Sequence, residues 1–234
     1  MSEPVPTGTT LTERYSRAVE YARVVHEGDV RKGTDITYLS HLLSVSALVL
    51  EGRGDEDQAI AALLHDTAED HGGEARIADI RAEFGRDVAA IVEACSDSLT
   101  EDPEPKPPWW TRKVRYLRQL EHEDPRAALV SCADKLHNAR AILADYRVEH
   151  EQLWSRFNAD AGRRGELWYY RRLAEILPPK LIVDGNPNPL GLELVRTVSD
   201  LRDAVAASPD APDAAALEEE WQSALRTEQD LLPA

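Results

Sequence analysis

The stretch that most restricts how this chain can fold is Leu63-Leu64-His65-Asp66-Thr67-Ala68-Glu69-Asp70. It places an imidazole and three carboxylates directly after an apolar segment, where a desolvated charge is costly unless a cation or hydrogen bonds compensate it. On a continuous helix, at about 100° per residue, the histidine and the three acids fall within one arc of about 140°. Ile60 and Leu64 point to the opposite side, towards a core. The stretch therefore predicts a metal site on one face of a helix.

Helical periodicity continues on both sides of this stretch, and no strand-like alternation of any length appears. A capping box at Thr10 to Glu13 predicts the start of a first helix, and Asp55 with Gln58 predicts the start of the helix that carries the motif. Gly72 and Gly73 predict its end. Further helices are expected near residues 37–50, 77–84, 88–92, 109–120, 127–143, 165–176, 192–205 and 214–225. The predicted fold class is all-α.

The distribution of polar and proline residues suggests how the chain is organised. Residues 1–9 are polar, contain two prolines and are expected to form a flexible N-terminal tail. One domain is expected over residues 10–205, followed by a C-terminal linker and helix over 206–234. Within the domain, the proline-rich residues 100–108 cannot be helical and predict an exposed connecting loop.

Composition narrows the possible partners and the compartment. The net charge of −16 disfavours nucleic acid and anionic membrane surfaces as partners, because both would be repelled. The two cysteines, Cys95 and Cys132, lie in helical patterns, which favours free thiols in a reducing compartment. No signal peptide is visible at the N-terminus, and no apolar stretch approaches the ~20 residues of a membrane span. The cytoplasm is therefore the expected location.

Two other helical segments each offer a further metal ligand. His41 lies in the helix expected over 37–50, and Asp134 in the helix expected over 127–143. Taken singly, His41 could be a hydrogen-bonded core histidine and Asp134 a buried ion-pair acid. Together with His65 and Asp66 they make a set of two imidazoles and two carboxylates, which suits manganese, iron, cobalt or zinc. The four residues are the predicted metal ligands.

The order of these residues resembles the HD-domain superfamily of metal-dependent phosphohydrolases, and in particular its RelA/SpoT-type alarmone hydrolases and their small single-domain relatives. The resemblance covers roughly residues 10–205. Two positions depart from the family pattern, with Thr37 in place of proline and Ser40 in place of asparagine. The matching motifs are Arg31-Lys32-Gly33, Tyr38-Leu39-Ser40-His41, His65-Asp66-Thr67-Ala68-Glu69-Asp70, Phe84-Gly85 and Cys132-Ala133-Asp134-Lys135-Leu136-His137-Asn138.

The resemblance implies a helical HD-domain bundle, a divalent metal cofactor, most simply Mn²⁺, and a small-molecule nucleotide substrate. That substrate would be guanosine tetra- or pentaphosphate, the alarmone of the stringent response, cleaved at its 3′-pyrophosphate to GDP or GTP and pyrophosphate. Glu69 and Asp70, one turn beyond His65 and Asp66, are the candidates to orient or deprotonate the attacking water. The residues expected to contact the substrate are Arg31, Lys32, Tyr38 and Asn138.

Two other functions stay open at this point. The chain could be an HD phosphohydrolase for another nucleotide, such as NADPH, or a non-catalytic nucleotide-binding module. His71 and His137 adjoin motif residues but are left outside the predicted metal shell, and His71 is expected at a solvent-exposed helix end. The exact substrate, the native metal, the oligomeric state and the role of the acidic C-terminal helix do not follow from the sequence.

Overall fold

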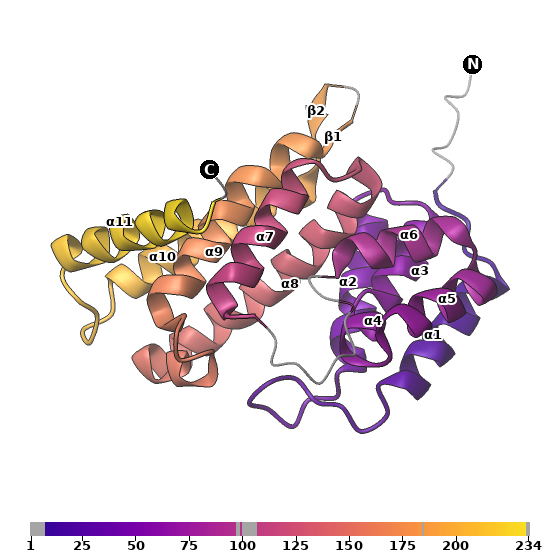
Figure 1. Ribbon diagram of the computed structural model, residues 1–234, viewed down its shortest axis with the longest axis horizontal. Coiled ribbons are helices and arrows are strands. Elements are labelled where there is room, and N and C mark those ends of the chain that lie inside the picture. Colours follow the sequence, from indigo (N-terminus) through magenta and orange to yellow (C-terminus); the bar gives the residue numbers. More distant parts are fainter. Residues whose placement is uncertain (1–7, 97–98, 100–106, 184, 233–234) are drawn as a thin grey trace, which may run out of the picture. The chain divides into compact units, whose positions relative to one another are not determined.

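The computed structural model describes residues 8–96, 99, 107–183 and 185–232. The described residues form two compact units, the first from those within 1–31 and 35–101 and the second from those within 32–34 and 102–234. Both are built from helices, and a two-stranded hairpin, β1 (Ile182–Val183) with β2 (Asn186–Pro187), is the sheet among the described residues (Figure 1). The all-α prediction is confirmed. The predicted N-terminal tail and the 100–108 loop lie largely outside the described residues.

The first unit is organised around one helix that is buried on every side. Its helices are α1 (Glu13–Val25), α2 (Leu39–Glu51), α3 (Glu56–Leu64), α4 (Thr67–Asp70), α5 (Gly73–Phe84) and α6 (Arg86–Cys95). All residues of α3 from Gln58 to Leu64 are buried, and α1, α2 and α6 pack against it. Three of the buried residues are alanines, whose small side chains let neighbouring helices approach closely. The core of the first unit therefore surrounds the helix that leads into the motif.

The two predicted capping boxes have different outcomes. At α3 the Asp55 side chain accepts from the backbone N–H of Gln58 and the Gln58 side chain accepts from that of Asp55, so this box is confirmed. At α1 the prediction is wrong, because the N-cap is Thr12, whose hydroxyl accepts from the backbone of Arg14. The backbone N–H of Thr12 donates instead to Glu56 at 2.5 Å. A tertiary partner thus replaces the local acid of the expected box.

The second unit is built on a long helix. Its helices are α7 (Trp109–Glu121), α8 (Pro125–Glu149), α9 (Gly162–Ile176), α10 (Pro189–Ala206) and α11 (Ala214–Asp230), with short 3₁₀ turns at His150–Arg156 and Pro178–Lys180. Asp124 caps α8 by accepting from the backbone of Arg126, and α10 packs along α8. Helix α8 has 25 residues. It begins before the expected residue 127, because Pro125 is compatible with a first helical turn, and it continues past the expected residue 143 to Glu149.

The acidic C-terminal helix, α11, packs on α9. Its Glu220 pairs with Arg163, and its Glu228 accepts a hydrogen bond of 2.9 Å from the Trp168 indole. Trp168 is fully buried and packs against Trp110, with ring centroids 4.7 Å apart. These contacts make α11 a packed part of the second unit.

Both cysteines are free, as predicted. Cys132 is buried, and burial raises the pKa of its thiol to about 12, so it is a neutral packing group at physiological pH. Cys95 is half-buried at the end of α6. Across the described residues, no helix is both long and apolar enough to cross a membrane.

A buried acid in α9 makes the stability of the protein depend on pH. Glu166 is 7% exposed, and burial raises the pKa of its carboxyl from 4.5 to about 7, against the opposing charges of Lys113, Lys32 and Lys135. Below pH 4.5 the group is protonated in both the folded and the unfolded chain. Between pH 4.5 and pH 7 the unfolded chain loses the proton first, so rising pH favours unfolding.

We therefore expect Glu166→Gln, which cannot ionise at this position, to remove the loss of folding stability that rising pH causes in the wild type. Relative to the variant, the wild type should lose up to about 3 kcal/mol of unfolding free energy between pH 4.5 and pH 8. Urea denaturation of both proteins at the two pH values measures the difference. Parallel pH dependences of the two proteins would contradict the raised pKa.

Candidate metal centre and active site

The His-Asp motif lies at a break between two helices. Helix α3 ends at Leu64 and α4 begins at Thr67, so His65 and Asp66 occupy the turn between them. The prediction of one continuous helix through residues 63–70 is therefore wrong. The Thr67 hydroxyl donates to the carbonyl of Leu64 at 2.7 Å, a local bond of the kind with which threonine competes with helix backbone pairing. The motif is presented at a helix junction and not along a helix face.

Three of the four predicted metal ligands meet at this junction. One donor atom each from His41, His65 and Asp66 lies within 4.8 Å of the others. The Oδ2 atom of Asp66 is 2.9 Å from His65 Nε2 and 3.6 Å from His41 Nε2, and the two imidazole rings are 5.2 Å apart. His41 is fully buried and His65 is 2% exposed. Helix α2 and the α3–α4 junction thus bring two imidazoles and a carboxylate together in a largely dry site.

The hydrogen bonding of His65 fits a metal ligand. Its Nδ1 atom lies 2.9 Å from the carbonyl of Ala62, which can only accept, so Nδ1 carries the hydrogen. In the neutral ring Nε2 then presents a lone pair towards the Asp66 carboxylate. Two electron-rich atoms 2.9 Å apart favour a cation beside them, and a backbone carbonyl on the second nitrogen is the usual partner of a metal-bound histidine. The donor set therefore fits a divalent ion.

Tyr38, predicted to contact the substrate, also contacts one of the predicted metal ligands. Its hydroxyl donates to Asp66 Oδ2 at 2.5 Å, which fixes the orientation of that carboxylate. The guanidinium of Arg31, also a predicted substrate contact, lies 5.9 Å from the centre of the Tyr38 ring, within the range of a cation–π interaction. Two predicted binding residues thus lie next to the cluster of predicted metal ligands in the first unit.

The predicted catalytic acids both lie in the four-residue helix α4. Glu69 is half-buried, and Asp70 is exposed. The backbone N–H of Asp70 donates to the carbonyl of Asp66 at 3.0 Å, so the chain keeps a helical turn after the junction. The acids therefore follow the ligand pair at the one-turn spacing expected from the sequence.

The remaining predicted residues belong to the second unit. Asp134 is 5% exposed in α8, and its carboxylate accepts from Lys135 and from the Asn138 amide, each at 2.6 Å. Burial alone would lower the pKa of Lys135, but the Asp134 carboxylate raises it well above its usual value, so the pair is ionic. Lys32 is exposed, with its amine 5.7 Å from the centre of the Phe157 ring. Asp134 and Asn138 share one face of α8, as predicted.

A second histidine cluster in the first unit was not predicted. His26 Nδ1 and His71 Nε2 lie 2.9 and 2.7 Å from the same oxygen of Asp29. His71 ends α4, as expected, but its side chain is engaged with Asp29 and is 34% exposed. The spacing of His26 and Asp29, three residues apart, was a usable signal, whereas the approach of His71 across 42 residues depends on the tertiary fold.

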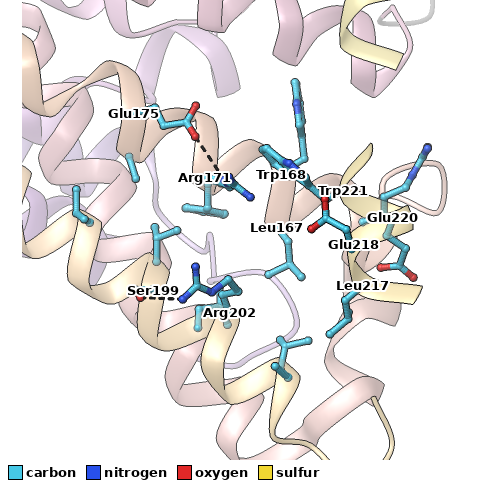
Figure 2. A pocket seen from close by; sticks show the side chains of 18 of the residues that line it. Leu167, Trp168, Arg171, Glu175, Ser199, Arg202, Leu217, Glu218, Glu220 and Trp221 are labelled. Carbon is cyan, nitrogen blue, oxygen red and sulfur yellow. Dashed lines mark hydrogen bonds and ion pairs between the residues drawn. The ribbon is translucent and has the colours of Figure 1, made fainter. Parts of the chain in front are cut away.

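A cavity of about 460 Å³ lies in the second unit, between α9, α10 and α11. Figure 2 shows its wall, where Leu167, Trp168 and Leu217 contribute apolar surface, while Arg171 pairs with Glu175 and Arg202 bonds to Ser199. None of the lining residues belongs to the predicted site. The cavity therefore adds nothing to the choice of catalytic residues.

Comparison with known protein families gives a match to the HD domain over residues 18–165. This range contains the His41, His65-Asp66 and Asp134 positions. The chain therefore belongs to the HD-domain family, whose members bind divalent metals and act as phosphohydrolases, and within it to the branch of the RelA/SpoT-type alarmone hydrolases.

Individual relatives point to one activity. The guanosine-3′,5′-bis(diphosphate) 3′-pyrophosphohydrolase MESH1 of Mus musculus is 33% identical over 148 residues, which cover 59% of this chain and 78% of the relative. MESH1 of Xenopus tropicalis is 36% identical over 53% of this chain and 67% of the relative. A solved structure, described as a metazoan orthologue of SpoT that hydrolyses ppGpp, has a TM-score of 0.61 at 23% identity and covers 82% of this chain and 97% of its own. The last likeness establishes the fold.

Proposed function

We propose that this protein is a guanosine-3′,5′-bis(diphosphate) 3′-pyrophosphohydrolase, which converts (p)ppGpp to GDP or GTP and pyrophosphate. The observation that carries the proposal is the meeting of His41, His65 and Asp66 at the α3–α4 junction within 4.8 Å, in a chain related to enzymes named for this reaction. The substrate class comes from those relatives, and the donor geometry supports metal-assisted hydrolysis.

The cofactor we propose is Mn²⁺. A set of imidazole and carboxylate donors suits this ion, and Asp134, in the second unit, remains the predicted fourth ligand. When bound, such an ion lowers the pKa of a coordinated water and polarises a phosphoryl oxygen. The hydrogen bond from Tyr38 to Asp66 orients the carboxylate for this role, as the Ala62 carbonyl does for His65.

The acids of α4 are proposed to act on the water. In this proposal Glu69, half-buried one turn after His65, accepts the proton of the attacking water, and the exposed Asp70 helps to orient it.

Cations have to offset the charge of the substrate. At a net charge of −16 the protein as a whole repels a polyphosphate, so binding requires local positive groups. Arg31, beside Tyr38, and Lys32 are proposed to contact the phosphates, Tyr38 the base, and Asn138 the base or ribose through its amide. Each of these roles continues the prediction drawn from the resemblance to the alarmone hydrolases.

A product assay tests the proposal. Purified protein with Mn²⁺ and guanosine tetraphosphate should release pyrophosphate and GDP in equal amounts, which ion-exchange chromatography resolves. The same assay with NADPH and nucleoside monophosphates addresses the alternative substrates. Preferred turnover of one of those would reject the proposal, as would tetraphosphate binding in calorimetry without product from metal-loaded protein.

A further inference from the structure

A group of side chains of metal-ligating types in the first unit takes no part in the proposed reaction. His26, Asp29 and His71 each contribute one ligand atom, and the three atoms lie within 4.8 Å of one another. The Oδ2 atom of Asp29 is 2.9 Å from His26 Nδ1 and 2.7 Å from His71 Nε2, and the two imidazole rings meet edge to face at 4.9 Å. None of these residues belongs to the predicted ligand set of the HD motif.

The surroundings of the three side chains favour a bound cation. His26 is 3% exposed, and burial lowers the pKa of its imidazole, so the ring is neutral at physiological pH and, in the tautomer with its hydrogen on Nε2, presents a lone pair at Nδ1. The hydrogen bond from His71 lowers the pKa of Asp29, so that carboxyl is ionised. His26 is also the C-cap of the 13-residue helix α1, whose carbonyl end carries partial negative charge.

The cluster is also reachable from solvent. The side chain of His71 is 34% exposed and that of Asp29 is 36% exposed, whereas the side chain of His26 is fully buried. An ion could therefore enter from the exposed side and keep a water as its remaining ligand. This arrangement, three protein donors with one open position, is common in zinc sites.

We propose that His26, Asp29 and His71 form a second divalent-metal site, distinct from the His41–His65–Asp66 centre, and that it takes Zn²⁺. Two imidazoles and one carboxylate are a donor set that zinc accepts readily, with ligand distances of about 2.0–2.2 Å. Donor atoms around such an ion lie roughly 3.3 Å apart in a tetrahedron. The present contacts of 2.7 and 2.9 Å would open by about half an ångström, which a side-chain rotation provides.

The position of the second site suggests what it would do. It joins residues 26 and 29, at the end of α1, to residue 71, at the end of α4. The His26 ring also stacks on Tyr38 at 5.1 Å with an angle of 29° between the planes. An ion bound here would therefore tie two chain segments together. It would also fix the ring of Tyr38, whose hydroxyl donates to Asp66. The role we infer is structural support of the first centre.

Counting zinc ions in four proteins tests the second site without reference to turnover. Chelator-treated wild type, His71→Ala, Asp66→Ala and the double variant are each equilibrated with excess Zn²⁺, desalted and analysed for zinc. We expect two ions per chain in the wild type, one in each single variant and none in the double variant. Because loss of even an outer-shell partner weakens binding by about 10–100-fold, loss of the His71 ligand should weaken zinc binding at least about 100-fold.

Two further variants keep the result interpretable. Asp29→Asn retains the size of the side chain but removes its charge, and it should also lose one ion. His122→Ala, at an exposed histidine at the end of α7, should bind as much zinc as the wild type. Melting curves of the metal-free proteins identify any variant that fails to fold. If His71→Ala or Asp29→Asn does not fold, the zinc count of the other variant decides.

A zinc count that is the same in the wild type, His71→Ala and Asp29→Asn would overturn the proposal and leave a hydrogen-bonded His-Asp-His group. If the His41–His65–Asp66 centre does not bind zinc, the result is different, because Asp66→Ala then has the same zinc count as the wild type. Failure of the proposed function would appear in the product assay alone.

Discussion

Asp66→Ala is expected to lower the kcat for pyrophosphate release by at least about 10³-fold, because charge stabilisation by a bound metal lowers the activation free energy by several kcal/mol. The Oδ2 atom of Asp66 is the point at which Tyr38, His65 and His41 converge, at 2.5, 2.9 and 3.6 Å. Removing it deletes a donor from the centre and leaves the Tyr38 hydroxyl without this acceptor. The loss should therefore appear in both ion content and turnover.

The measurement pairs two readouts on the same preparation. Manganese content by elemental analysis and initial rates with guanosine tetraphosphate should fall together in Asp66→Ala. His122→Ala, with its exposed histidine, serves as the matched control and should change neither. An Asp66→Ala protein that folds, loses its ion and still turns over at the wild-type rate would exclude the metal centre from the reaction.

Glu69→Gln has the second largest expected effect. The substitution keeps the size of the side chain and removes its ability to accept a proton, so kcat should fall by about 10²–10⁴-fold, the usual contribution of a general base. The ion content should stay at the wild-type level, because Glu69 is not a predicted ligand. Rates measured across substrate concentrations should show the loss in kcat, with KM changed little.

Glu74→Gln is the appropriate control for this variant. Glu74 is an exposed acid in the first turn of α5, five residues further along the chain, and its neutralisation should leave the rate unchanged. If Glu69→Gln instead reduces the ion content, Glu69 acts as a ligand and the assignment of the proton acceptor passes to Asp70. An unchanged rate with unchanged ion content would remove Glu69 from the mechanism.

Much of the fold was accessible from local sequence signals. The apolar spacing in the helix over Leu39–Glu51 and the reciprocal cap at Asp55 and Gln58 are local patterns, and local patterns determine where helices begin and which face they bury. The predicted cap of α1 was wrong because the backbone of Thr12 takes its partner, Glu56, from 44 residues away. Local spacing does not encode such a tertiary competitor.

Some features of the site were likewise predicted from local sequence, and others were missed. The meeting of His41 with His65 and Asp66 was predicted, because the sequence shows residues of metal-ligating types on separate helical segments. The break at Thr67 was not, since its hydroxyl bond to Leu64 competes with a helical pattern that looks continuous. The approach of His71 to Asp29 was missed because it depends on where α1 and α4 end in space.

The burial of α3 has a consequence for how this protein could be re-engineered. From Gln58 to Leu64 every side chain is enclosed, and adding even a few methylenes to such an interior typically costs 1–3 kcal/mol. The helix that delivers the motif is thus a poor place for diversity in a mutant library, whereas exposed acids of the first unit such as Glu74 can change without repacking a core. Selection for a new substrate should therefore accumulate substitutions outside α3, with the sequence of α3 staying nearly constant.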